Sequence, residues 1–432
     1  MAQNVTGTNL ATNWRAHYAE PVVEVYCDWN MDGDYSDDAE NVSAYVLSGT
    51  CNIELYDSLV GLPMLGGGRM SSAQVTLSNP NGYFSPDNSS GLAGTYPAVA
   101  NGLYRVPIII KAGYVDPTNG AETLRQFTGV IEGYGDSERI GVRQITLNCR
   151  GRERLLSQHK VTTNVQSDRR VDQLMATHLA AAGETSTALD RSVSIIDHEW
   201  LDDANLLEQL CLLAAADGGW FYYDENGVAR YEHATHWLEG SNHINAVATL
   251  DEGGTLSITD ALTWKDVYKS VVVEYSPIAV GLLTTVYQAA KTLVVPPGKS
   301  ITEKCRFMLV AKSIIAPQAG VDYDACSAGG TNLSGDLSVA VTPYYAAQAD
   351  ITLTNNNANH AIYVYGLQLR GFPLVIDEAQ EVRASSDLAV IDGEKEYAMR
   401  GNDWIQSREQ AERVANRMRD LLENPQRLWT WE

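Results

Sequence analysis

One acidic segment near the N-terminus carries the residues best suited to chemistry. Oxygen-bearing side chains recur there at alternate positions, namely at Asp28, Asn30, Asp32, Asp34 and Ser36. A hard cation such as Ca²⁺ takes about six to eight oxygen ligands, and alternation aims such side chains inward around a tight loop. Ca²⁺ is therefore the candidate cofactor of this chain, and these five residues are its candidate metal ligands.

The far end of this segment departs from the calcium loop of helix–loop–helix proteins. Such a loop has glycine at its sixth position, where this chain has Gly33, and a bidentate glutamate at its twelfth. Ala39 stands at the twelfth position and Glu40 follows it, and strands rather than helices are predicted on both sides. The alternative is an acidic hairpin tip whose Asp and Asn side chains bond to their own backbone, and we favour it.

Catalytic patterns are sparse in this chain. It has no G-x-S-x-G, H-E-x-x-H, Walker A or glycine-rich dinucleotide motif. His233 and His236 have metal-like spacing but no evident third ligand, so we interpret them as surface imidazoles. Gly66 to Gly68 precede a strand rather than a helix, which favours a flexible turn over a phosphate site. A hydrolytic carboxylate pair assembled in space stays open, yet nothing selects one, and we predict no enzymatic activity.

Charge and composition exclude several classes of protein. Asp and Glu number 54 against 31 Lys and Arg, which gives a formal charge of −23, and no basic cluster supplies the face of a nucleic-acid binder. No window approaches the roughly 18 consecutive apolar residues of a membrane-spanning helix. The polar N-terminus lacks a secretory signal. We expect no membrane span and no specific nucleic-acid binding.

The first third of the chain has the pattern of an all-β domain. The 432 residues suggest about two to four domains, and residues 1–20 are polar without periodicity, which indicates an N-terminal extension. Between residues 21 and 160, short runs of strand character alternate with turn residues. The runs are 22–26, 42–46, 51–55, 72–77, 106–112, 125–131 and 143–149. This density of short strands predicts a first β-barrel or sandwich over 21–160.

Helical spacing appears after residue 160 and predicts a small α/β domain over 161–254. Apolar residues recur at helical spacing in 170–182 and in 203–216, where Asp202 or Asp203 would cap the second helix. A hairpin with strands at 220–223 and 228–231 is expected to follow.

The rest of the chain is again rich in strands. Residues 255–278 and 377–432 are predicted to form a second β-domain, and residues 279–376 to form an inserted β-sandwich. Near the C-terminus, Ser407 and Gln410 form a capping box at the start of a helix that Asn424-Pro425 ends. The predicted fold class is mainly β with a small α/β domain.

Several stretches together resemble the tail hub (baseplate hub) and minor tail proteins of tailed bacteriophages. The segment Leu77-Ser-Asn-Pro-Asn-Gly-Tyr-Phe-Ser-Pro86 resembles their segment of strand, Asn, Gly, aromatic residue and Ser-Pro. Val25–Asp37 is similar to their opening strand and acidic loop, and Thr128–Gly133 to the end of their first β-domain. Leu206–Tyr223 resembles the helix and aromatic strand of their α/β domain. The likeness extends over most of the chain, and residues 279–376 fit it least.

The resemblance implies an architecture, a location and a set of partners. It implies two β-barrel domains of the tail-tube type, an α/β hub domain and an inserted β-sandwich, in a homotrimer that matches the six-fold tail tube. The partners would be other copies of this chain, the distal tail protein, the tail-tube and tape-measure proteins, and tail fibre or tip proteins. The chain would be assembled in the host cytoplasm and act at the tail tip of the virion. There an acidic lumen would let DNA pass during genome ejection without binding it.

A function of another class is the alternative. The chain would then be a carbohydrate-binding or adhesin-like tail protein that contacts host surface glycans. The contact would be made by the inserted β-sandwich of residues 279–376, with Ca²⁺ held at Asp28–Asp38.

Overall fold

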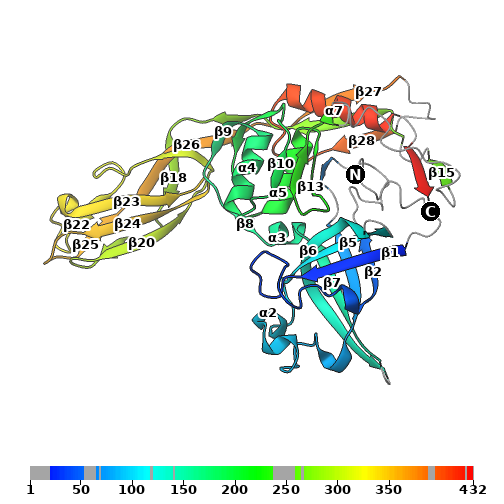
Figure 1. The fold of residues 1–432 in the computed structure, drawn as a ribbon. Helices are drawn as coiled ribbons and strands as arrows, with labels where there is room; N and C mark the ends of the chain where they lie inside the picture. The colour runs from blue at the N-terminus through cyan, green and yellow to red at the C-terminus, as the bar shows by residue number, and fades with distance from the viewer. Residues whose placement is uncertain are drawn as a thin grey trace.

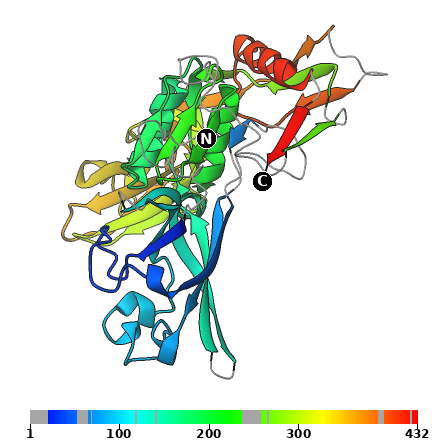
Figure 2. The same ribbon diagram turned by 45° about the vertical axis from the view of Figure 1, so that its right-hand side comes forward.

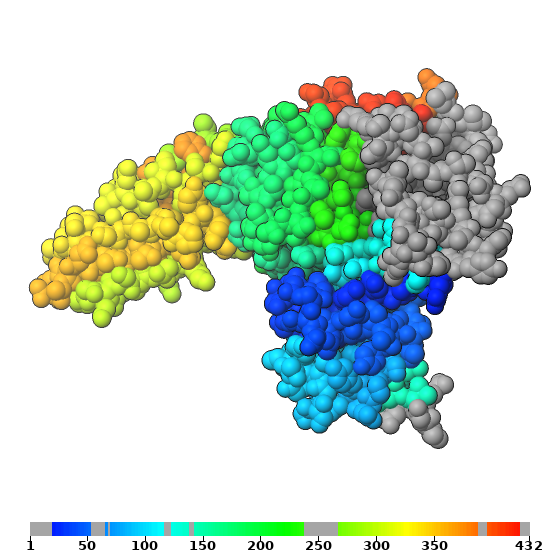
Figure 3. All heavy atoms as spheres, viewed as in Figure 1, coloured from blue at the N-terminus to red at the C-terminus, as the bar shows by residue number. Residues whose placement is uncertain are grey.

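A central α/β part carries two projecting parts in this computed structural model (Figures 1 and 3). The first barrel projects below the centre in the view of Figure 1, and the part around residues 279–376 projects to one side. The structure describes residues 20–52, 65–67, 70–116, 120–139, 142–236, 258–263, 267–387, 395–423 and 426–431. The predicted N-terminal extension therefore lies outside the described residues except for Glu20, and so does Asn424-Pro425.

The first barrel is one curved, six-stranded antiparallel sheet. Its strands are β1 (Glu20–Cys27), β2 (Val46–Asn52), β4 (Ser72–Ser78), β5 (Pro107–Asp116), β6 (Gly120–Arg139) and β7 (Val142–Gly151). They lie in the order β1-β5-β6-β7-β4-β2. Alternate residues of β4 and β7 point inward, among them Val75, Leu77, Ile145 and Leu147, which are all buried. The period of two in the sequence thus predicted the inner face correctly.

The two edges of this sheet meet at one end, so the barrel is almost closed. The Val42 amide donates to the carbonyl of Val25 at 2.9 Å, and the Val25 amide donates to Ser43 Oγ at 2.9 Å. Tyr26 and Asn41 form an isolated antiparallel bridge beside them. Strand β1 is therefore joined to the segment that precedes β2 rather than to β2 itself.

The predicted strand at 42–46 is wrong. Ser43–Tyr45 form a 3₁₀ turn, η1, and strand β2 begins only at Val46. The reason is local: Asn41 Oδ1 accepts hydrogen bonds from the amide of Ser43 at 3.1 Å and from its hydroxyl at 2.6 Å. An Asx turn of this kind competes with strand pairing, and the apolar–polar alternation does not reveal it.

A long connection between β4 and β5 covers the lower end of the barrel. It contains η2 (Pro80–Gly82), η3 (Leu92–Gly94) and α2 (Pro97–Ala100). Phe84, Leu92, Val99 and Leu103 from this connection are buried in the barrel's hydrophobic core. The connection is therefore part of the core and not a surface loop.

The central α/β part begins directly after β7. Its elements are α3 (Glu153–Ser157), β8 (Lys160–Val161), β9 (Gln166–Arg170), α4 (Val171–Ala181), β10 (Thr187–Leu189), β11 (Ile195–Glu199), β12 (Ala204–Asn205), α5 (Leu206–Ala216), β13 (Trp220–Tyr223) and β14 (Ala229–Glu232). The two predicted helices and the hairpin are confirmed in α4, α5, β13 and β14. The predicted cap of α5 is wrong, because Asn205 Oδ1 accepts the amide of Glu208 at 3.2 Å while Asp203 pairs with Lys160.

Two glycines join the first barrel to this part. Gly66 and Gly67 form β3, which pairs in parallel with Trp220 and Phe221 of β13. A Cβ on Gly67 would lie 2.3 Å from Cys211 Sγ, and one on Gly66 would lie 2.5 Å from the Cys211 carbonyl oxygen. The predicted flexible turn is therefore wrong for Gly66 and Gly67, which form a strand packed on α5, and Gly68 lies outside the described residues.

The second β part contains two small sheets and the last helix. Its elements are β15 (Ile258–Thr263), β16 (Ser270–Tyr275), β27 (Gln380–Ser385), β28 (Glu396–Met399), α7 (Arg408–Leu422) and β29 (Gln426–Trp431). Strands β27, β16 and β28 form one sheet, and β15 pairs with β29. Figure 2 shows α7 lying along this sheet. Buried residues of β16 and α7, such as Val271 and Val414, share one hydrophobic core with α4 and α5.

The part between Ile278 and Ile376 is all-β and has its own core. Its strands are β17 (Ile278–Val280), β18 (Thr284–Gln288), β19 (Leu293–Val295), β20 (Ser300–Arg306), β21 (Ala311–Ile315), β22 (Asp324–Cys326), β23 (Leu337–Tyr344), β24 (Gln348–Asn355), β25 (Ile362–Tyr365) and β26 (Gln368–Ile376). Val286, Ile351, Leu353 and Leu369 are fully buried in that core. The Arg306–Asp202 ion pair at 2.7 Å ties it to the centre.

The helices of the described ranges are all too short or too polar to cross a membrane.

Candidate functional site: the first barrel, its corner and its acidic loop

The acidic loop leaves β1 and returns to it. The Asp28 amide donates to the Pro107 carbonyl at 3.0 Å, and the Cys27 amide donates to the Glu40 carbonyl at 2.9 Å. The loop from Asp28 to Glu40 is therefore closed at its base by backbone hydrogen bonds. Opening this base would also separate β1 from the segment before β2.

Within the loop, side chains accept hydrogen bonds from nearby backbone amides. Asp28 Oδ1 accepts from Asp32 at 3.2 Å, and Asp28 Oδ2 accepts from Gly33 at 2.9 Å. Asp32 Oδ1 accepts from Asp34 at 3.0 Å, and Asp34 Oδ1 accepts from Ser36 at 2.9 Å. These are the bonds expected of an acidic hairpin tip.

Two carboxylates converge on one amide group in this loop. Asn30 Nδ2 donates to Asp32 Oδ2 at 3.0 Å and to Asp37 Oδ2 at 2.7 Å. Of the five candidate ligands, Asp28 is buried, while Asn30, Asp32, Asp34 and Ser36 are exposed. Throughout the described ranges, no three His, Cys, Asp or Glu side chains are grouped as a ready-made metal cage.

Glu40 lies at the end of this loop and is not among the five candidate ligands that the spacing predicts. Its side chain is fully buried, its Oε2 accepts the Asp37 amide at 3.1 Å, and its Oε1 has no hydrogen-bond partner. Burial raises the pKa of Glu40, and the charges of Asp28, Asp37 and Asp32 raise it further, against the hydrogen bond from Asp37. The sequence indicates this residue in one way, because Glu40 directly follows the twelfth loop position, which Ala39 occupies.

The segment Leu77–Pro86 forms a corner that ties β4 to the β6–β7 hairpin. Asn79 is fully buried: its Oδ1 accepts the Phe84 amide at 2.9 Å and its Nδ2 donates to Ser85 Oγ at 2.9 Å. Ser85 Oγ in turn donates to Asp136 Oδ2 at 2.7 Å. A hydrogen bond from Arg143 lowers the pKa of Asp136. The side chain of Asn79 therefore holds the corner together, and the side chain of Ser85 joins the corner to Asp136 of β6.

Glycine and asparagine make the tight path of this corner accessible. Asn81 has φ +55° and Gly82 has φ +70°, a left-handed region that these two residue types adopt most readily. A Cβ on Gly82 would also lie 2.8 Å from Arg143 Nη1. The left-handed backbone thus favours the Asn-Gly pair, and a Cβ on Gly82 would also make the end of the Arg143 side chain shift.

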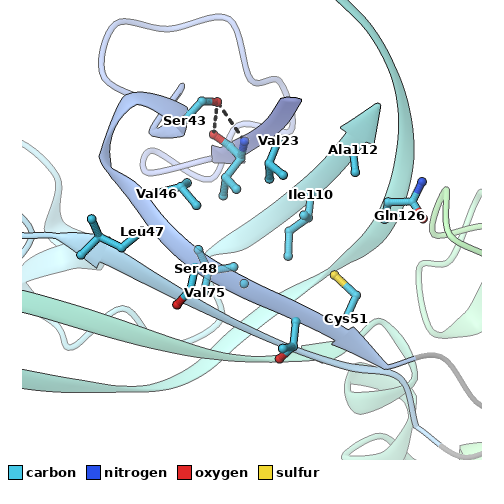
Figure 4. A pocket seen from close by; sticks show the side chains of 13 residues that line it. Val23, Ser43, Val46, Leu47, Ser48, Cys51, Val75, Ile110, Ala112 and Gln126 are labelled. Carbon is cyan, nitrogen blue, oxygen red and sulfur yellow. Dashed lines mark hydrogen bonds between the residues drawn. The ribbon is translucent and has the colours of Figure 1, made fainter. Parts of the chain in front are cut away.

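A cavity of about 510 Å³ opens between β1 and β2, where the barrel is not closed (Figure 4). Val23 and Val25 line it from β1, Ile110 from β5, and Leu47 and Cys51 from β2. Most of the lining is aliphatic, and no cluster of catalytic side chains faces it. The cavity is open because the hydrogen bonds between Val25 and the segment before β2 close the gap between β1 and β2 at one end only.

His233 and His236 do not stand free on the surface, so their interpretation as surface imidazoles is wrong. His236 Nδ1 lies 2.5 Å from Asp190 Oδ2, and His233 Nε2 lies 4.0 Å from the same oxygen. His236 Nε2 lies 3.6 Å from Glu232 Oε1. The two imidazoles belong to a half-buried network that follows the ends of β10 and β14.

Comparison with known proteins finds likeness in structure only. No family model and no curated protein matches the chain. The tail protein of Neisseria meningitidis MC58 is 12% identical with a TM-score of 0.38, and the 43 kDa tail protein of prophage MuSo2 from Shewanella oneidensis is 10% identical with a TM-score of 0.39. Each match covers 59% of this chain and 64% of the other.

A third structure, the PdpA–VgrG complex of Francisella, is 11% identical with a TM-score of 0.34 over 83% of this chain and 53% of the other. This chain therefore spans less than two thirds of the length of each of these three structures. Likenesses with TM-scores this low carry no functional inference by themselves. Tail proteins, one of them from a prophage, are nevertheless among the structures that this fold resembles, as the sequence resemblance led us to expect.

Proposed function

We propose that this chain is a structural subunit at the tip of a bacteriophage tail. It forms a trimeric hub that closes or adapts the tail tube and connects it to distal tail and host-recognition proteins, and it catalyses no reaction. The observation that carries the proposal is the Leu77–Pro86 corner. The segment with the most specific family resemblance is the one that fixes the end of a six-stranded, nearly closed barrel.

The edge strands of that barrel support self-association. Among the described strands, β1 and β2 are the edges of the sheet, and β2 is exposed along most of its length. Leu47 of β2 is 52% exposed and Val23 of β1 is 45% exposed. Apolar side chains on an unpaired strand edge favour contact with another chain. We therefore assign the exposed parts of β1 and β2 to the contact between subunits.

The charge of the chain supports passage of DNA through the ring. A formal charge of −23 per subunit repels phosphate groups, and repulsion keeps a passing genome from binding to the wall. The tube, tape-measure, distal tail and fibre or tip proteins are the partners proposed for the other faces. Assembly takes place in the host cytoplasm, before the tail is complete.

The oligomeric state of the purified chain tests the trimer. Light scattering should give three times the 47.2 kDa of one chain. Leu47→Glu should shift the mass to one chain, since it places a charge on the proposed contact. Leu282→Glu, at a leucine that is 90% exposed and lies outside the barrel, is the matched control and should leave the mass unchanged. A monomer at high concentration would contradict the trimer.

A further inference from the structure

The Glu40 carboxylate is buried without a charge to balance it. The residue is fully buried, and Oε1 has no hydrogen-bond partner. Asp28 is fully buried beside it, and neither carboxylate makes an ion pair with any Lys, Arg or His among the described residues. A buried carboxylate without a cation or a full set of donors is strongly unfavourable.

The neighbours of Glu40 are acidic as well. The charges that act on its carboxyl group include those of Asp28, Asp37 and Asp32. Backbone amides satisfy part of this group, since Asp28 accepts two amides and Glu40 Oε2 accepts one. These amides leave Glu40 Oε1 free and leave the repulsion between the carboxylates in place.

The backbone explains why Glu40, one residue beyond the twelfth position, can face into the loop. Ala39 has φ +73°, a left-handed conformation that turns the chain inward before Glu40. Trp29 Nε1 donates to the Ala39 carbonyl at 2.8 Å and holds this turn in place. The extra residue is thus absorbed by one turn, and the glutamate that the sequence spacing misplaced is brought back to the loop.

We propose that the loop Asp28–Glu40 is a Ca²⁺ site in which both oxygens of Glu40 close the coordination shell. Asp28, Asn30 and Asp32 supply side-chain oxygens, and Asp34 supplies its backbone carbonyl, because its carboxylate is engaged by Ser36. Ser36 stands at the position that commonly coordinates through water. The ion draws together carboxylates that now converge on the amide of Asn30.

The donor set favours Ca²⁺ over Mg²⁺. Ca²⁺ accepts carbonyl and bidentate carboxylate oxygens in flexible geometry, whereas Mg²⁺ requires near-octahedral geometry and retains water. The ion would act on the barrel as well as on the loop. Glu40 accepts the Cys27 amide through its carbonyl, and Val42 binds Val25 two residues later, so a fixed loop also fixes the closure of the barrel.

Calcium titration of the chelator-treated full chain tests the site. Isothermal titration should give one Ca²⁺ per chain, and 1 mM Mg²⁺ should not replace it. Saturating Ca²⁺ should raise the midpoint of thermal unfolding by about 5 °C or more. Glu40→Gln and Asp32→Asn should each weaken Ca²⁺ binding by about tenfold or more. Asp32 is exposed, so its variant tests the site without risk to the core.

Asp38→Asn is the matched control, because Asp38 is exposed and its side chain makes no hydrogen bond or ion pair with a described residue. It should bind Ca²⁺ within about twofold of the original chain. In a chelator, Glu40→Gln should unfold at the same or a higher temperature than the original chain, since it removes an uncompensated charge. With saturating Ca²⁺, the original chain should unfold at a higher temperature than Glu40→Gln.

Three outcomes would overturn the site: no Ca²⁺ binding up to millimolar concentration, equal losses in Asp38→Asn and Glu40→Gln, or no reversal of the order of stability. The site is independent of the tail-tip proposal. A chain that binds Ca²⁺ as a monomer would leave the site standing and contradict the trimer, and a trimer without Ca²⁺ would do the opposite.

Discussion

At the scale of single residues, Asn79 shows how a polar side chain can hold a fold together. Both ends of its amide are hydrogen-bonded in a fully buried position, to the Phe84 amide and to Ser85 Oγ. We expect Asn79→Ala to reduce the free energy of unfolding of the barrel by about 3 kcal/mol, because it leaves the buried Phe84 amide without an acceptor. Urea unfolding measures this change.

Asn101→Ala is the control for that variant. Asn101 is exposed at the end of α2, so its loss should change the free energy of unfolding by about 0.5 kcal/mol or less. If the two variants lost equal stability, the corner at Leu77–Pro86 would have no special role in the barrel.

Glu153 makes the junction between the barrel and the α/β part sensitive to pH. Burial raises its pKa to about 7, against hydrogen bonds that include one from Ser71. The unfolded value is 4.5. Since the pKa is raised in the folded state, the contribution of Glu153 is fully present below pH 4.5 and is lost as pH rises through 7. At about 1.4 kcal/mol for each pKa unit, a pKa raised from 4.5 to about 7 corresponds to about 3–4 kcal/mol of stability that is lost when Glu153 ionises.

Glu153→Gln should therefore be more stable than the original chain at pH 8, and the difference should shrink toward pH 5. The measurement is the midpoint of thermal unfolding of both chains from pH 5 to pH 8. Glu208→Gln removes an exposed carboxylate of α5 and should show no such pH-dependent difference. Parallel pH profiles for Glu153→Gln and the original chain would refute the assignment.

Residue types and spacing predicted the acidic loop, but not the burial of Glu40 within it. Asp28, Asn30 and Asp32 stand out because they alternate. Glu40 does not, because its approach depends on the left-handed turn at Ala39 and on burial, which only the folded chain reveals.

At the scale of elements, β3 shows how two glycines allow a strand to pack closely on a helix. Gly67 lies against Cys211 of α5, and any larger residue there would collide with the sulfur. Gly67→Ala should lower the free energy of unfolding by about 1–3 kcal/mol through overpacking. Adding Cys211→Ala should restore part of that loss, because it removes the Sγ atom that the new methyl group meets.

Gly335→Ala is the matched control, because nothing lies within 4 Å of its added Cβ. It should be close to neutral in thermal unfolding. A double variant no more stable than Gly67→Ala alone would show that β3 does not depend on this contact.

Sequence patterns predicted several of the helices and one hairpin in advance. The stripes of α4, α5 and α7 and the hairpin β13–β14 follow directly from spacing. Ser407 caps α7 and accepts the Gln410 amide at 3.3 Å, but the predicted capping box is incomplete, because Gln410 Oε1 accepts the Gln406 amide at 3.0 Å instead of the Ser407 amide. The errors at 42–46 and at Gly66 and Gly67 have a common cause. In both places a tertiary contact or a side-chain bond, not the local pattern, selects the backbone conformation.

At the scale of the molecule, two hydrophobic cores follow the predicted domain divisions and one crosses them. The described residues form three buried clusters: one in the barrel, one in the 279–376 part, and one shared by the α/β part and the second β part. Met418 and Leu210, which lie far apart in the sequence, belong to the shared cluster. The predicted boundary at residue 254 therefore has no separate core on each side, and the second tube-type barrel stays part of the proposal.

The most direct test of the proposed tail-tip function is electron cryo-microscopy of phage tails purified from cells that produce this chain. Three copies should surround the tail axis at the end of the tube, each with its six-stranded barrel against the tube and its 279–376 part directed outward. A tail tip whose density holds no copy of this chain, or holds it without three-fold symmetry, would contradict the claim.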